Sequence, residues 1–158
     1  IIAKHPAQCN YLNLKGIILL HQKKPRRALA CFKKSIKLSP EQPKGYIHAG
    51  VTLDIIGAEN RAELLLKHAH SLKPNNITTK IRLIDINLKT GDSGEVEHYL
   101  NKLLSSATIS DIMNSLNQLS GEPFVQTDRI TALAGRINTE LEKQTDTVST
   151  PGTGQKGS

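Results

Sequence analysis

Apolar and small residues follow a helical period through most of this chain. Residues 25–38 show it clearly, because Ala28, Phe32 and Ile36 lie four residues apart and share one face of a helix. The preceding stretch, residues 7–22, also has a helical pattern, and the two stretches recur together further along the chain. The pattern therefore predicts a succession of antiparallel helix pairs.

The pairs recur at a fixed interval of 34 residues, which the prolines mark first at Pro6, Pro40 and Pro74. The same interval separates Gly16 from Gly50, Ala28 from Ala62, Leu38 from Leu72 and Gly57 from Gly91. Small residues allow two helices to approach closely, and glycine just after a helix suits a left-handed end. A period between about 20 and 50 residues is typical of stacked repeats, which bind partners along an extended surface.

The residues at these positions resemble the pattern of the tetratricopeptide repeat family. With Gly16 at the family's conserved small position, Ala28 takes the central alanine, Phe32 the aromatic residue and Pro40 the closing proline. The second repeat matches better, through Tyr46, Gly50, Leu53, Gly57, Ala62, Leu66, Ala69 and Pro74. The third repeat is degenerate, since it has Ile84, Val96 and Thr108 at the glycine, alanine and proline positions. The resemblance implies an all-α fold, a right-handed α-solenoid of stacked antiparallel helix pairs with irregular C-terminal capping helices.

We expect the chain to form one domain made of successive units. Residues 1–6 are the remnant of a preceding repeat, 7–40 repeat 1, 41–74 repeat 2, 75–106 the degenerate repeat 3, 107–143 the capping helices and 144–158 a disordered tail. The tail is predicted from its Thr, Gly, Ser and Lys content, with no apolar residue after Val148. Because Pro6 holds the closing position of an incomplete repeat, we interpret the chain as cut inside a longer array, and expect self-association through its exposed N-terminal end.

In this family the first helix of each repeat lines a concave groove that binds a peptide or protein segment. The equivalent positions here are Asn10, Asn13, Ile17, His21, Lys44, Ile47, His48, Val51, Asp54, Thr78, Arg82, Asp85 and Lys89. Lys44, His48 and Arg82 are expected to supply charge-assisted hydrogen bonds to an acidic or carbonyl-rich ligand. Ile47 and Val51 are expected to supply apolar contacts.

Two specialised subclasses of the family do not fit these positions. The carboxylate clamp that binds the C-terminal tails of heat-shock chaperones requires, in chain order, a Lys–Asn pair, a second Asn and a Lys–Arg pair. This chain has Asn13, Ile17, His48, Thr78 and Arg82 there, and only Arg82 matches. The asparagine ladder of the sugar-transferring superhelices fails in the same way, with Leu14, His48 and Arg82 at its sites.

Charge is distributed unevenly along the chain. Residues 1–91 carry 16 Lys and Arg against 5 Asp and Glu, whereas residues 92–158 carry 5 against 9. Within one stretch of fifteen residues without an acid, the basic ridge comprises Lys23, Lys24, Arg26, Arg27, Lys33, Lys34 and Lys37. It lies opposite the apolar face of its helix, on the convex side of the expected solenoid. Either it is a solvated face, or it docks on an anionic surface such as phospholipid, an acidic protein or nucleic acid.

Other chemistry finds little support in the sequence. The six histidines, His5, His21, His48, His68, His70 and His98, have no metal-ligand spacing on one helical face, and no phosphate loop or nucleophile motif is present. We therefore expect no enzyme activity, metal or cofactor. Three Tyr and two Phe offer little for stacking on bases, so specific nucleic-acid recognition is not expected. Cys9 and Cys31 are predicted to be free thiols, too far apart for a bridge, which is typical of a reducing compartment such as the cytoplasm.

Two functional classes remain open. The first is a protein-protein interaction module, or scaffold, that binds a peptide or protein segment in its concave face. The second is a structural arm of a larger multidomain protein, which positions an effector or catalytic domain elsewhere. The basic ridge is compatible with either class.

Overall fold

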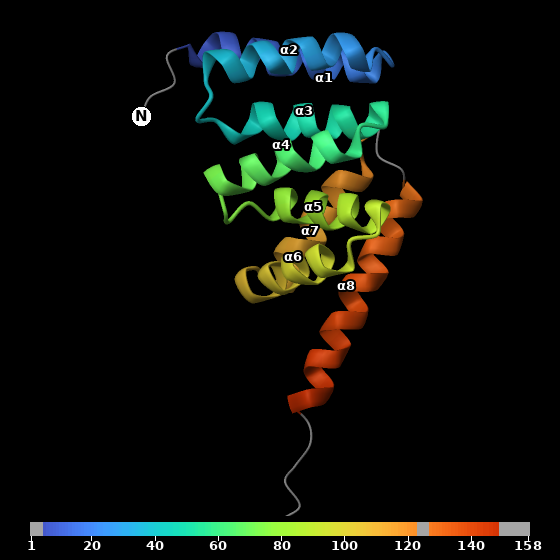
Figure 1. The fold of residues 1–158 in the computed structure, drawn as a ribbon. Coiled ribbons are helices and arrows are strands. Elements are labelled where there is room, and N and C mark those ends of the chain that lie inside the picture. The colour runs from blue at the N-terminus through green and yellow to red at the C-terminus, as the bar shows by residue number, and fades with distance from the viewer. Residues whose placement is uncertain (1–4, 123–126, 149–158) are drawn as a thin grey trace, which may run out of the picture.

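The computed structural model describes residues 5–122 and 127–148, and this part of the chain is almost entirely helical. Its eight helices are α1 (Pro6–His21), α2 (Pro25–Leu38), α3 (Pro43–Ile56), α4 (Glu59–Leu72), α5 (Ile77–Thr90), α6 (Ser93–Ser106), α7 (Ile109–Ser120) and α8 (Thr127–Val148). The first six form three hairpins, α1 with α2, α3 with α4 and α5 with α6, which stack in chain order (Figure 1). The prediction of an all-α solenoid of helix pairs is confirmed.

The helix ends lie where proline and glycine predict them. Pro6, Pro25 and Pro43 stand in the first turns of α1, α2 and α3, where the missing proline N–H has no helical partner to lose. Gly57 and Gly91 follow α3 and α5 with φ of 90° and 82°, a left-handed conformation that a Cβ would disfavour. The 34-residue interval between Gly57 and Gly91 therefore reflects the same helix end in two successive hairpins.

Small residues bring the paired helices into close contact. A Cβ added at Gly16 in α1 would overlap the ring of Phe32 in α2, which is fully buried. At the equivalent Gly50 in α3, a Cβ would lie 3.2 Å from the carbonyl oxygen of Ala62 in α4. The helices of the first two pairs are therefore held at the separation that the repeat pattern implies.

The third hairpin packs well although its sequence is degenerate. Ile84 and Val96, which replace the small residues, are fully buried in a core that extends from Leu53 in α3 to Ile137 in α8. Because α5 also contacts α7 and α8, its larger side chains fill space between the hairpin and the capping helices.

The two C-terminal helices depart from the stack. Helix α7 packs against α5, and α8 runs obliquely along α5 and α7 until its last part projects beyond the stack (Figure 1). The disordered tail was expected from residue 144, and this is wrong for residues 144–148, which continue α8. Extending a formed helix requires no new nucleation, and the hydroxyls of Thr145 and Thr147 donate to carbonyls one turn back. The expected repeat remnant, residues 1–4 in particular, and the rest of the tail, 149–158, lie outside the described residues.

Candidate peptide-binding groove

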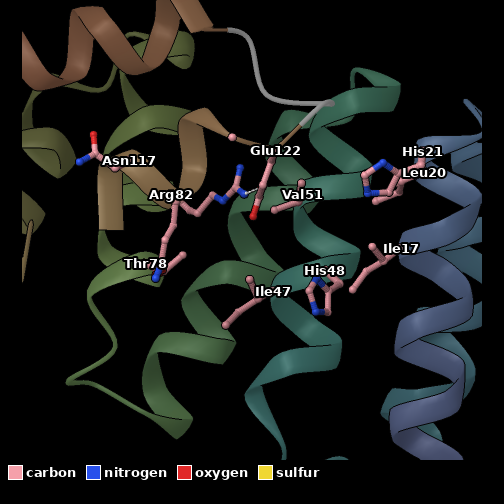
Figure 2. A pocket seen from close by; sticks show the side chains of 12 residues that line it. Ile17, Leu20, His21, Ile47, His48, Val51, Thr78, Arg82, Asn117 and Glu122 are labelled. Atoms are coloured by element: carbon pink, nitrogen blue, oxygen red, sulfur yellow. Dashed lines mark hydrogen bonds and ion pairs between the residues drawn. The ribbon is translucent and has the colours of Figure 1, made fainter. Parts of the chain in front are cut away.

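A cavity of about 460 Å³ opens on the concave face between α1, α3, α5 and α7 (Figure 2). Seven of the residues expected in the groove line it, namely Ile17, His21, Ile47, His48, Val51, Thr78 and Arg82. Their placement follows from the repeat, because His48 and Arg82 are 34 residues apart, as are Ile17 and Val51. Each first helix thus presents equivalent positions to the same hollow.

Five further residues of the lining were not expected: Leu20, Asn117, Gln118, Gly121 and Glu122. Four of them belong to α7 or follow it directly, and α7 lies outside the 34-residue period. Its apolar spacing identified a helix, but no repeat position related that helix to the groove. Leu20 was missed although it lies one turn beyond Ile17 on the same helix.

His48 lines the groove and packs against a buried aromatic ring. Its ring stacks on Phe32, with centroids 5.2 Å apart and planes 24° from parallel. Burial, together with the positive charges of Arg82 and Lys44, lowers the pKa of His48 from 6.5 to about 4. The imidazole is therefore neutral at physiological pH and brings no positive charge of its own to a ligand.

Arg82 already has an acidic partner within the chain. Its guanidinium forms an ion pair with the carboxylate of Glu122, which follows α7, and the two side chains point toward each other in Figure 2. The side chain of Arg82 is only 12% exposed, and its Nε is buried without a hydrogen-bond partner among the described residues. The positive charge that was expected to attract a ligand is thus neutralised.

Asp54, Asp85 and Lys89 do not line the cavity, although they were expected there. Arg129 of α8 donates to Asp85 at 2.8 and 3.1 Å and to Asp54 at 3.2 Å. Lys89 forms ion pairs with Asp54 at 2.9 Å and with Glu59. Burial raises the pKa of the Asp85 carboxyl, and the guanidinium of Arg129 opposes that shift. These groups fasten α8 to the first helices of two repeats.

The last three expected residues, Asn10, Asn13 and Lys44, also lie outside the cavity. Asn10 is exposed, whereas Asn13 is buried with its Oδ1 unpartnered among the described residues. Lys44 is exposed beside a neighbouring hollow of about 340 Å³, which it shares with Glu41, Lys73 and Asn76. Asparagines 10 and 13 therefore cannot hold a ligand within the main hollow.

The basic ridge is exposed at all seven positions, on α2 and the turn before it. Within the described residues none of the seven forms an ion pair, and Lys24 donates only to the neutral side chain of Gln22. Lys23 lies in the left-handed region, with φ of 57°. The ridge is thus an uncompensated positive surface on an outer helix.

Two other kinds of site, a metal centre and a membrane span, are absent from the described residues. Among residues 5–122 and 127–148, no cluster of His, Cys, Asp and Glu has the geometry to hold a metal ion. None of the helices described is both long and apolar enough to span a bilayer. Cys9 and Cys31 are buried free thiols, and the Cys9 sulfur lies 3.0 Å from the Ser39 hydroxyl.

The chain matches no protein-family model and no curated protein sequence. It is similar to solved structures of tetratricopeptide domains. The first TPR domain of Spaghetti (RPAP3), bound to the HSP90 peptide SRMEEVD, aligns with a TM-score of 0.63 and 15% identity over 77% of this chain and all of that one. The Sgt2 TPR domain from Aspergillus fumigatus aligns with a TM-score of 0.62 and 11% identity over 96% of this chain and 91% of that one.

A third structure, the TPR2AB domain of yeast Sti1 in complex with a pHSP90 peptide, aligns with a TM-score of 0.66 and 16% identity. That alignment covers 84% of this chain and 47% of the Sti1 chain. At these identities the similarity establishes the fold, which is the tetratricopeptide solenoid.

Proposed function

We propose that this chain is a protein-interaction module whose concave groove binds a peptide or protein segment. The observation that carries the proposal is the hollow itself, which is bordered by four helices and presents Ile17, Ile47 and Val51 beside hydrogen-bonding groups. Protein pockets of a few hundred Å³ with such mixed linings are the usual places for ligands. The RPAP3 and Sti1 domains, which share the fold, are described in complex with HSP90 peptides.

Capture of chaperone tails by a carboxylate clamp is not part of the proposal. Asn13 is buried outside the cavity, His48 is neutral, and Arg82 is paired with Glu122. A terminal carboxylate would therefore find no free cation at the clamp positions that line the main hollow.

The groove can be tested with peptides selected from a random phage-displayed library on the wild-type chain. Binding of each selected peptide is then measured by fluorescence polarisation to Ile17→Arg and Thr78→Arg, two half-buried lining positions. We expect both variants to weaken binding at least about tenfold, since a charge in the lining is left without a partner. Leu64→Arg, on the exposed side of α4, is the control and should bind like the wild type.

Circular dichroism melts of all variants separate loss of binding from loss of fold. If the selected peptides bind the wild type and both groove variants equally, the groove is not the working surface. The structural-arm function is then the better account of the chain.

A second candidate function, docking of the basic ridge on anionic phospholipid, is favoured by the seven exposed cations without ion pairs in the described residues. Long Lys side chains on a convex surface can reach a flat array of head groups. Sedimentation with phosphatidylserine vesicles should show binding at low salt that falls as ionic strength rises. Lys33→Glu with Lys34→Glu should remove most of it, whereas Arg61→Glu with Lys73→Glu, an equal charge change elsewhere, should not. Binding only to nucleic acid or to an acidic protein would exclude the lipid.

A further inference from the structure

We infer that the segment bound in the groove is electrically neutral and inserts apolar side chains, and that it is not an acidic peptide. This inference rests on the proposed function and specifies the partner's chemistry. It departs from the expectation based on Lys44, His48 and Arg82, because His48 is packed on Phe32, Arg82 is paired with Glu122 and Lys44 lies outside the main hollow.

The charged and titratable groups of the lining include Arg82, Glu122 and His48. Arg82 and Glu122 neutralise each other across the hollow. His48 is held in its neutral form by burial, with its ring against Phe32. An acidic ligand would have to displace Glu122 from Arg82 and leave that carboxylate half-buried and unpaired beside its own. Like charges brought together in a partly desolvated site oppose binding.

Further charged groups lie at the border of the groove. Asp54 and Asp85 are paired with Arg129 and Lys89, so they offer no attraction to a basic ligand. Lys44 is exposed and lies outside the main hollow, beside a neighbouring one that it shares with Glu41 and Lys73. Within the main hollow, Arg82 and Glu122 pair with each other and therefore leave no unpaired charge of either sign for a ligand.

The lining offers apolar side chains and neutral polar groups to a ligand. Ile17, Leu20, Ile47 and Val51 come from α1 and α3 and border one side of the hollow (Figure 2). Thr78 from α5 provides a neutral hydroxyl and Gln118 from α7 a neutral amide, whereas the side chain of Asn117 points away from Arg82 in Figure 2. Such groups pair with backbone N–H and C=O of a bound segment, while the apolar side takes its side chains. The lining is thus complementary to a neutral segment with apolar side chains along one edge.

The experiment uses two probes, the acidic peptide SRMEEVD and a peptide selected from a random library on the wild-type chain. We expect the selected peptides to lack net negative charge and to bind with an affinity that changes less than about twofold as salt rises from low to high. The wild type should bind SRMEEVD at least about tenfold more weakly than the selected peptide. Glu122→Gln frees the charge of Arg82 and should raise the affinity for SRMEEVD about tenfold, the effect of one charge-assisted hydrogen bond. Glu97→Gln, the same change at an exposed position of α6, should not.

The inference is overturned if the selected peptides are rich in Asp and Glu, or if the wild type binds SRMEEVD as tightly as the selected peptide and Arg82→Gln abolishes that binding. Either result leaves the groove as a peptide site, so the proposed function survives. If no selected peptide is sensitive to Ile17→Arg or Thr78→Arg, the proposed function fails and the inference fails with it.

Discussion

Arg129 in α8 donates two hydrogen bonds to the carboxylate of Asp85 in α5, from Nε at 3.1 Å and from Nη2 at 2.8 Å. The two residues are 44 positions apart, and the third nitrogen of the same guanidinium donates to Asp54 in α3 at 3.2 Å. One side chain therefore joins the capping helix to the first helices of two successive repeats. Planar, bidentate pairs of this kind fix orientation as well as distance.

Replacing Arg129 should loosen α8 and lower stability. The side chains of Asp85 and Arg129 are 15% and 25% exposed, so Arg129→Met leaves a largely buried carboxylate without its partner. We expect the free energy of unfolding in urea to fall by about 1–3 kcal/mol, the usual cost of losing hydrogen bonds to a charged group. Arg136→Met, at an exposed position of the same helix, is the control and should have little effect.

A double-mutant cycle with Asp85→Asn distinguishes the pair from the separate effects of its members. The combined loss should be smaller than the sum of the single losses, because each single change removes the same interaction. Additive losses would show that the pairing of Arg129 with Asp85 contributes nothing, and that Arg129 acts through Asp54 or through its packing.

Gly16 and Gly135 should respond oppositely to the same substitution. In Gly16→Ala the new methyl group overlaps the buried ring of Phe32, so we expect a loss of about 1–3 kcal/mol from overpacking. Gly135 lies inside α8 with nothing within 4 Å of a new Cβ, so Gly135→Ala should gain about 0.5–1 kcal/mol. Thermal melts of the two variants check both signs. Equal stability of Gly16→Ala and the wild type would mean that the two helices of the first pair are further apart than described.

The sequence predicts the part of the fold that repeats and little of the part that does not. Gly16 and Gly50 are 34 residues apart because each lets two helices approach closely, and Gly57 and Gly91 are 34 apart because each ends a helix at positive φ, so their roles follow from pattern alone. The pairing of Arg129 with Asp85 has no such signature, since it depends on where an irregular helix crosses the stack. The position of α7 was unpredictable for the same reason.

The groove shows the same division between pattern and tertiary environment. Repeat positions identified seven lining residues but not their charge states. The neutral form of His48 and the pairing of Arg82 both depend on groups brought near by folding. The residue type determines which charges a side chain can carry, whereas its neighbours in the fold determine its protonation state and whether its charge is paired.

His48 should make stability depend on pH. Burial lowers its folded pKa to about 4 from 6.5, so between these values the unfolded chain binds more protons than the folded one. Its contribution to stability is therefore complete above the unfolded pKa and is lost as pH falls toward the folded pKa. We expect about 2 kcal/mol less stability at pH 5 than at pH 7 from this residue.

The measurement is urea unfolding of the wild type and His48→Gln at both pH values. Other groups titrate in the same range. The informative quantity is therefore the difference between the wild type and His48→Gln in the slope of unfolding free energy against pH. His48→Gln should lose less stability than the wild type on acidification. Identical slopes would show that His48 is not kept neutral by the fold.

The exposed side of α1 should cause self-association. Helix α1 has apolar residues on all sides, and Tyr11, Leu14 and Ile18 are 59%, 59% and 49% exposed. The residues 34 positions after Tyr11 and Ile18, Gly45 and Thr52, are buried, and Gly45 lies against Ile36 of the preceding hairpin. No hairpin among the described residues covers the outer side of α1, and apolar surface of this kind favours contact with another protein.

We expect the sedimentation coefficient of the wild type to rise with protein concentration. Ile18→Glu places a charge on the outer side of α1 and should keep the chain monomeric over the same range. Leu64→Glu, at a position of α4 that is 67% exposed, is the matched control and should associate like the wild type. A wild type that stays monomeric at every concentration, or an equal loss of association in Leu64→Glu, would contradict the prediction. In either case the outer side of α1 is not a contact surface between copies of this chain.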